Sequence, residues 1–239
     1  VPPAHIDAML DDPDNYNFDG ESKELSVLFA DIRGFTSISE ALTASELKTF
    51  LNDFFTPITS IIFDHSGTID KYVGDMVMAF WGAPITDPDH RKNSVLAGLE
   101  MLAKIEELKI GFAEQGLPEA NIGVGINSGF MNVGDMGSTY RRSYTVLGDA
   151  VNLGSRMESI TKFYGVKFLI GEETYDHIDG FLCRLIDKVL KSNLFEFMSL
   201  FVKRKMQQRK CINWLKNIML LMSIMCIKNG IKQKVALKH

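Results

Sequence analysis

Residues 25–31 read LSVLFAD, an apolar run from Leu25 to Ala30 that ends on the carboxylate of Asp31. A short apolar run rich in β-forming residues predicts a buried strand. The next residues, 32–37 (IRGFTS), form a turn that leads into a helix. Such a turn exposes backbone N–H groups, which together with the helix dipole can hold a phosphate. The plainer interpretation is that Asp31 caps the helix, the usual role of an isolated aspartate at this place.

A second carboxylate lies in a predicted hairpin. Residues 68–73 and 76–80 have the composition of two strands, and Gly74-Asp75 between them supplies a tight turn. Gly-Asp is an ordinary hairpin tip, so Asp75 alone indicates little. If the hairpin pairs beside the first strand, however, Asp31 and Asp75 meet at one end of the sheet. Two close carboxylates repel unless a cation lies between them, and hard oxygen ligands fit Mg²⁺ or Mn²⁺ rather than zinc.

Helices and strands alternate in the rest of the chain. A capping-box pattern at 43–46 predicts a helix with an apolar face up to residue 62, bent at Pro57. A second helix is predicted to open at Asp87-Pro88. The further predictions are a strand pair, 122–126 and 130–133, around the turn 127–129; strands at 144–147, 166–170 and 182–186; and a helix at 149–163. This order predicts an α+β fold with a largely antiparallel sheet.

Composition excludes several classes of protein. With 46% hydrophobic and 23% charged residues among 239, the chain can bury a core and is not a low-complexity protein. Its net charge of −4 argues against a surface that binds nucleic acid by charge. Three cysteines without a CxxC spacing exclude a disulfide framework and a cysteine zinc site, and they suit a reducing compartment. No apolar stretch reaches the roughly 18 to 20 residues that cross a bilayer.

Charge divides the chain into three parts. Residues 1–22 are acidic and turn-rich, as in a linker, and residues 23–189 form the predicted domain. Residues 190–239 hold 11 basic residues and one acidic residue, a net charge of +10. This tail has three possible interpretations. It is a frameshifted, non-native extension; or it is a basic amphipathic segment that binds anionic lipid or a partner helix; or it is a packed terminal helix. Because the chain starts at Val1 without a methionine, we expect a piece of a longer protein.

Three motifs follow one another in the predicted domain: FADIRGFT at 29–36, KYVGD at 71–75 and YTVLGDAVNLGSR at 144–156. In this order and spacing they resemble the catalytic domain of class III nucleotidyl cyclases, of the bacterial adenylyl cyclase type, over residues 24–189. The resemblance implies a ferredoxin-like, mixed sheet flanked by helices. It also implies an enzyme that converts ATP to 3′,5′-cyclic AMP and pyrophosphate, by in-line attack of the ribose 3′-hydroxyl on the α-phosphate.

The resemblance implies two Mg²⁺ or Mn²⁺ ions, held by Asp31, Asp75 and the carbonyl of Ile32. One ion would lower the pKa of the 3′-hydroxyl, and the other would hold the triphosphate and the leaving pyrophosphate. The turn that follows is then expected to bind substrate through Gly34, Phe35 and Thr36.

Two polar residues lie four positions apart on the predicted helix 149–163 and so project from one face. The resemblance assigns Asn152 to positioning the ribose and Arg156 to stabilising charge on the transferred phosphorus, a role that suits a permanently ionised guanidinium. The alternative for Arg156 is a surface pair with Glu158 or Glu172. Arg141 is a candidate contact of the β and γ phosphates, or else a solvated residue of a basic loop.

Lys71 and Thr145 resemble the pair that selects adenine in this family, because guanylyl cyclases place an acid and a small residue there. Lys71 can donate to adenine N1, and Thr145 can accept from or donate to the purine edge. Each residue alone is also an ordinary strand residue. The alternatives to an adenylyl cyclase are a guanylyl cyclase, against which Lys71 argues, and a non-catalytic nucleotide-binding module.

The family builds each site across a dimer interface, so the resemblance implies a homodimer that binds ATP. It also implies a cytoplasmic domain of a larger, membrane-anchored protein, with membrane contact through the missing regions or the basic tail. The family's Lys-Gly-Lys segment, whose last lysine contacts the triphosphate, is absent after Val189. Lys191 is the candidate substitute.

Overall fold

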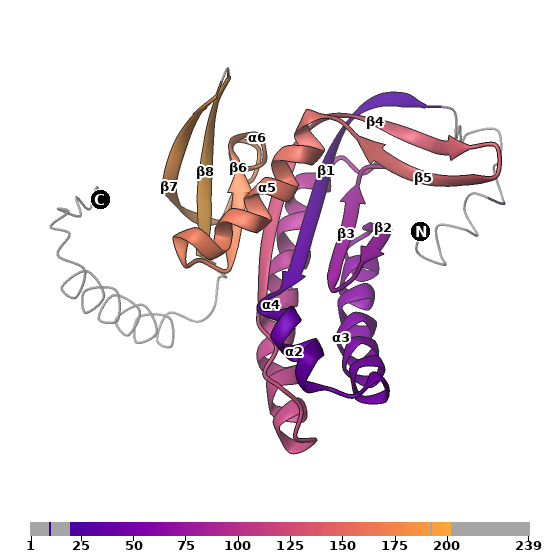
Figure 1. Ribbon diagram of the computed structural model, residues 1–239. Coiled ribbons are helices and arrows are strands. Elements are labelled where there is room, and N and C mark those ends of the chain that lie inside the picture. The colour runs from indigo at the N-terminus through magenta and orange to yellow at the C-terminus, as the bar shows by residue number, and fades with distance from the viewer. Residues whose placement is uncertain (1–9, 11–19, 192, 202–239) are drawn as a thin grey trace, which may run out of the picture. The chain divides into compact units, whose positions relative to one another are not determined.

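Eight strands form one sheet around β1 (Glu21–Ile32) in the part of the chain that the computed structural model describes, residues 10, 20–191 and 193–201 (Figure 1). The strand order is β2-β3-β1-β4-β6-β8-β7, and β5 pairs with β4 off this path. All pairings are antiparallel except the parallel pair β4–β6. The predicted α+β fold with a mixed, largely antiparallel sheet is therefore confirmed. The other strands are β2 (Thr68–Val73), β3 (Met76–Trp81), β4 (Ile122–Ser138), β5 (Arg141–Leu147), β6 (Phe168–Gly171), β7 (Leu182–Lys191) and β8 (Asn193–Phe201).

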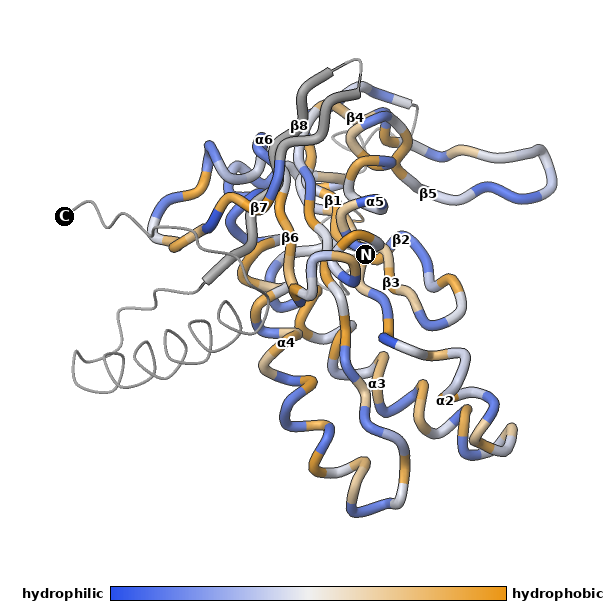
Figure 2. The backbone as a smooth tube through the Cα atoms, turned by 60° about the vertical axis from the view of Figure 1, so that its left-hand side comes forward, coloured by the Kyte–Doolittle hydropathy of each residue, from blue (hydrophilic) through white to orange (hydrophobic). Residues whose placement is uncertain are grey.

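From Leu25 to Ala30, β1 is buried on both faces, which explains the largely apolar sequence of this part of the strand. Leu28 and Ile32 belong to a core that includes side chains of α3 (Ala44–Asp64) and α4 (His90–Glu114). Val27 and Phe29 belong to a second core, with residues of β3, β4, β5 and α5 (Asp149–Tyr164). Because successive residues of a strand face opposite sides, one strand supplies both cores. Hydrophobic residues accordingly mark the central strands in Figure 2.

The predicted capping box begins α3. The Thr43 hydroxyl accepts a hydrogen bond from the Glu46 N–H at 3.4 Å, and the Glu46 carboxylate accepts one from the Thr43 N–H at 2.8 Å. The helix then continues without interruption through Pro57. α4 begins at His90, with Asp89 as its N-cap, rather than at the predicted Asp87-Pro88. The short helices are α2 (Phe35–Ala41) and α6 (Glu172–Tyr175).

The predicted turn at 127–129 is wrong, because β4 runs straight through it. Ser128 faces Ser26 of β1 in the register, and their hydroxyls are hydrogen-bonded at 2.7 Å. The Asn127 amide donates to the carbonyl of Ala150 at 2.9 Å. The polar residues that indicated a turn are therefore buried and paired, and the long partner strand β1 keeps the backbone extended.

The sheet continues past residue 189, since β7 ends at Lys191 and β8 follows from Asn193. The side chain of Lys191 and the tail from residue 202 onwards lie outside the described residues. None of the helices in the described part of the chain is long and apolar enough to cross a membrane.

Candidate active site

The register of the sheet brings Asp31 and Asp75 together. Ala30 of β1 pairs with Val77 of β3, so the turn before β3 lies beside the last residues of β1. Gly74 adopts a φ of 63° in that turn, which a residue without Cβ tolerates best. The two carboxyl groups are hydrogen-bonded to each other, and both residues are half-buried. The expected meeting of the two carboxylates is thus present in the structure.

The electrostatics of the pair are unfavourable without a cation. Burial raises the pKa of Asp31 to about 7, with further upward contributions from the hydrogen bond and the charge of Asp75. Glu158 adds a smaller upward effect, whereas Arg33 lowers the pKa. The raised pKa of Asp31 means that its negative charge is unfavourable beside Asp75, and a divalent cation would compensate that charge.

Arg33 and Glu158 form an ion pair beside the two aspartates that the sequence did not indicate. Arg33 Nη1 lies 3.1 Å from Glu158 Oε1, and Arg33 also donates to the hydroxyl of Thr161. Burial raises the pKa of Glu158, and the Arg33 charge opposes that shift. The alternative in which Glu158 pairs with Arg156 is therefore wrong, because Arg33 occupies that carboxylate.

The aspartate pair fits the predicted ions. Carboxylate oxygens are the hard ligands that Mg²⁺ and Mn²⁺ prefer, and the raised pKa marks a place where positive charge is stabilising. Among the described residues, no group of three or more His, Cys, Asp and Glu side chains forms a fuller ligand set. The carbonyl of Ile32, water and substrate phosphates would therefore complete the coordination.

Lys71 and Thr145 also lie together, and a third residue joins them. Lys71 Nζ is 3.5 Å from the Thr145 hydroxyl oxygen. Asp70 lies against both: Thr145 donates its hydroxyl to Asp70 Oδ2 at 2.5 Å, and Lys71 Nζ is 3.1 Å from Asp70 Oδ1. The Asp70 side chain is fully buried, while the Lys71 side chain is 47% exposed. Sequence reasoning missed Asp70, although it directly precedes Lys71.

Asn152 and Arg156 occupy an exposed face of α5. Within the described residues, no hydrogen bond or ion pair joins either of them to Asp31, Asp75 or Lys71. One chain therefore carries two separate sets of predicted residues, which the structure does not bring into contact.

The remaining predicted residues lie in two turns. Gly34, with a φ of 70°, is the N-cap of α2, and Phe35 and Thr36 start that helix directly after β1. Arg141 is exposed at the tip of the hairpin β4–β5, where it pairs with Ser138. Figure 1 shows this hairpin projecting from the sheet.

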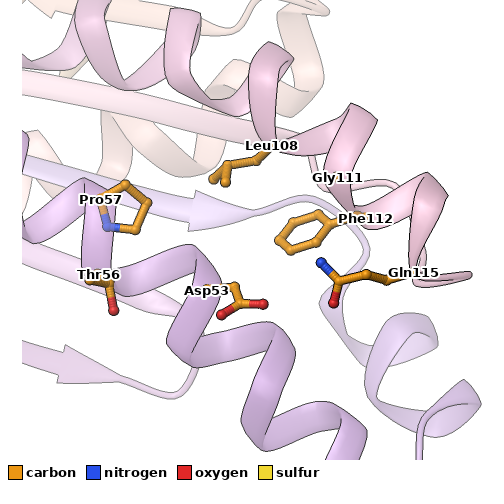
Figure 3. A pocket seen from close by; sticks show the side chains of 7 residues that line it. All are labelled: Asp53, Thr56, Pro57, Leu108, Gly111, Phe112 and Gln115. Atoms are coloured by element: carbon orange, nitrogen blue, oxygen red, sulfur yellow. The ribbon is translucent and has the colours of Figure 1, made fainter.

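Two pockets in the described part of the chain lie away from these residues. A pocket of about 400 Å³ lies between α3 and α4 (Figure 3), lined by Asp53, Thr56, Pro57, Leu108, Gly111, Phe112 and Gln115. Another, of about 380 Å³, lies beside Asn127 and Ser128 and carries the carboxylates of Glu24, Asp149, Glu172 and Glu173. Neither set of lining residues contains a cation, so neither pocket suits a triphosphate.

The sequence and the fold of this chain are similar to those of known proteins. Residues 19–193 match the family model described as the adenylate and guanylate cyclase catalytic domain. The chain is 38% identical to an adenylate cyclase of Anabaena cylindrica over 174 residues, which cover 71% of this chain and 34% of the relative. It is 35% identical to adenylate cyclase 1 of Rhizobium meliloti, over 62% of this chain and 22% of the relative.

Solved structures agree with this assignment. The adenylyl cyclase CyaB from P. aeruginosa superposes with a TM-score of 0.73 at 34% identity, covering 78% of this chain and 98% of that chain. The guanylyl cyclase Cya2 superposes with a TM-score of 0.70 at 29% identity, covering 79% and 97%. The chain belongs to the class III adenylate and guanylate cyclase catalytic domain family. It spans about a third or less of the length of the curated relatives it matches.

Proposed function

We propose that this chain is an adenylyl cyclase catalytic domain that converts ATP to 3′,5′-cyclic AMP and pyrophosphate. The observation that carries the choice of base is the contact between Lys71 and Thr145. Lys71 would donate to adenine N1, and Thr145 would meet the 6-amino group. A guanine presents an N1–H donor at the first position, so it faces the lysine donor unfavourably.

The metal-binding residues in this proposal are Asp31, Asp75 and the carbonyl of Ile32. Two bound Mg²⁺ or Mn²⁺ ions would supply acidification of the 3′-hydroxyl and charge neutralisation at the triphosphate. The carboxylate groups of Asp31 and Asp75 lie close together, so they would position the ribose and the phosphates of the substrate at this end of the sheet. The N–H groups of Phe35 and Thr36, at the first turn of α2, lack helical acceptors by geometry and would bind phosphate oxygens.

Asn152 and Arg156 would act on the reacting part of ATP. Asn152 orients the ribose, so that the 3′-oxygen attacks the α-phosphorus in line while the bond to pyrophosphate breaks. Arg156 donates to the oxygens on the α-phosphorus, where negative charge grows. Arg141 would contact the β and γ phosphates.

The two separate residue sets support a homodimer in which each site takes its aspartates from one chain and its Asn152 and Arg156 from the other. Both sets are present here, so two equivalent sites would form and a monomer would be inactive. The cytoplasmic location and membrane tether expected from the resemblance stay predictions.

The test is to incubate the chain with ATP or with GTP in the presence of Mn²⁺ and to identify the cyclic product. We expect cyclic AMP from ATP, with turnover lost in Asp31→Ala and Asp75→Ala. Cyclic GMP formed in preference would favour the guanylyl cyclase alternative. Nucleotide binding without any cyclic product would favour the regulatory module.

A further inference from the structure

The side chain of Asp70 is buried against the two residues proposed to read the base. A buried carboxylate is costly unless each of its neighbours donates to it. Thr145 donates its hydroxyl to Asp70 Oδ2 at 2.5 Å, the Val146 N–H donates to the same oxygen at 3.4 Å, and the Lys71 ammonium lies 3.1 Å from Oδ1. Asp70 therefore accepts two hydrogen bonds through Oδ2, whereas Oδ1 forms an ion pair with Lys71 and accepts no hydrogen bond.

A β-bulge explains how neighbours in sequence reach the same place. In the register of β2 and β3, Ile69 faces Ala79 and Lys71 faces Met78, so Asp70 is an extra residue without its own partner. Successive side chains of a regular strand point to opposite faces, whereas a bulge redirects them. As a result, both Asp70 and Lys71 contact Thr145.

We propose that Asp70 is a positioning residue that fixes the hydrogen-bond direction of Thr145 and so makes the site selective for a 6-amino purine. A hydroxyl has one proton and can either donate or accept toward a ligand. Once that proton is directed at Asp70, the Thr145 oxygen has only lone pairs left for a base. It can then accept from the 6-amino group of adenine, but it repels the 6-oxo group of guanine.

Asp70 also holds the second reader in place. The ammonium of Lys71 forms an ion pair with Asp70 and donates one hydrogen bond to Thr145, so it keeps N–H donors for an acceptor such as adenine N1. The pair therefore presents one donor and one acceptor, the complement of the adenine edge. Because this role concerns base choice, it depends on the proposed cyclase function.

The experiment compares three triphosphates in each protein sample: ATP, the analogue with hydrogen at C6, and inosine triphosphate with oxygen at C6. Ratios of kcat/KM within one sample do not change with the fraction of folded protein. In the wild type we expect ATP to exceed the C6–H analogue by about tenfold, for the one hydrogen bond of the 6-amino group. We expect that analogue to exceed inosine triphosphate by more than this, because inosine carries both a 6-oxo group that faces Thr145 and an N1–H that faces Lys71. Equal use of the C6–H and C6-oxo analogues by the wild type would overturn the proposal without any variant.

Asp70→Leu removes the acceptor while leaving an apolar side chain of similar shape in a buried place. The Thr145 hydroxyl can then turn toward a 6-oxo group, so inosine triphosphate should gain about tenfold relative to the C6–H analogue. In a Thr145→Val background the hydroxyl is gone, and Asp70→Leu should leave that ratio unchanged. Asp64→Leu, which removes an exposed carboxylate at the end of α3, is the matched control.

The outcomes separate the two proposals. Suppose that the wild type prefers ATP. If Asp70→Leu then leaves the kcat/KM ratios unchanged, or changes them equally in the wild-type and Thr145→Val backgrounds, only the proposed role of Asp70 is contradicted. Cyclic product from GTP rather than ATP contradicts the proposed substrate. If no cyclic product forms, the same analogues are compared as competitors of a fluorescent ATP analogue, and the order of their affinities tests Asp70 independently of turnover.

Discussion

Asp31 and Asp75 bring two carboxyl groups into contact at the end of a buried strand, an arrangement that opposes folding unless positive charge or a proton is present. A pair of residues with such an energetic cost indicates a role in binding a ligand rather than in stabilising the fold. Arg33 does not remove the cost, because its guanidinium is paired with Glu158. Metal binding and stability are therefore coupled at this pair.

We predict that Asp75→Asn abolishes cyclase activity and the stabilisation by Mn²⁺, while the chelated protein unfolds at the same or a higher temperature than the wild type. The substitution removes repulsion between like groups as well as a metal ligand. For the wild type, metal at a hundred times its Kd should add about 2.7 kcal/mol to the free energy of unfolding. Thermal unfolding with Mn²⁺ and with EDTA measures both effects. Asp53→Asn, in the pocket between α3 and α4, is the control, and a full Mn²⁺ shift in Asp75→Asn would contradict the metal site.

The buried ring of His90 leads us to predict that the folded protein loses stability in acid. Burial lowers the pKa of His90 to about 4, helped by the charge of Arg91, and the ring Nδ1 lies 2.8 Å from the Ser26 hydroxyl. The unfolded chain binds this proton near pH 6.5 and the folded chain only near 4. Stability from the neutral ring is thus complete above pH 6.5 and falls by about 3 kcal/mol as the pH drops to 4.

Urea denaturation of the wild type and of His90→Asn, at steps between pH 7 and pH 4, measures this contribution. The difference in free energy of unfolding between the two proteins should shrink as the pH falls, because only the wild type has the buried ring. His65→Asn, at the partly exposed pair with Glu100, is the matched control. A difference that is constant over this range would show that His90 titrates normally.

At the residue scale, the sequence predicted the position of side chains that regular strands place in the site. It missed the one side chain, that of Asp70, whose position depends on an irregularity. Asp31 lies next to the last residue of β1 and Asp75 directly before β3, so a regular antiparallel pairing of these strands suffices to bring them together. Asp70 stands at a bulge, and a bulge depends on how two strands pair rather than on either sequence. Alternation along the strand would have placed Asp70 and Lys71 on opposite faces.

At the scale of elements, local signals predicted what local contacts decide. The capping box at Thr43 lies within four residues, and it begins α3 as expected. The turn signal at 127–129 failed because Asn127 and Ser128 find partners in distant elements, α5 and β1. Tertiary pairing overrode the turn propensity there.

The approach of α5 to β4 allows a prediction at the same scale. A Cβ on Gly125 of β4 would lie 2.2 Å from the backbone N of Glu158, so Gly125→Ala must push helix and strand apart. We expect the free energy of unfolding to fall by about 3 kcal/mol. Activity should also fall in the protein that still folds, because α5 carries Asn152 and Arg156.

Gly111→Ala is the matched control, since a Cβ there meets nothing within 4 Å on the helix α4. That variant should gain about 0.5 to 1 kcal/mol from helix propensity. Chemical denaturation compares the three proteins. Equal stability of Gly125→Ala and the wild type would contradict the close packing of α5 on the sheet.

At the scale of the whole molecule, the order of elements predicted the sheet, whereas the predicted site residues fall into two sets that do not touch within one chain. The aspartate pair lies at the end of β1, and Asn152 and Arg156 lie on an exposed face of α5 without contact to it. No sequence pattern shows which residues face each other across two copies, because the copies have the same sequence. A test of the proposed homodimer must therefore mix chains.

We predict that Asp75→Ala and Arg156→Ala are each inactive alone and regain activity when mixed. Random exchange of equal amounts gives half heterodimers, and each of these has one site with an intact Asp75 from one chain and an intact Arg156 from the other. The mixture should therefore show about a quarter of the wild-type activity per chain. The control is a mixture of Asp75→Ala with Asp31→Ala. Both variants lack a residue of the same half of the site, so no pairing of these chains restores a complete site. A site shared between two chains would be contradicted if the control mixture regained activity. It would also be contradicted if the first mixture regained none after subunit exchange had been verified.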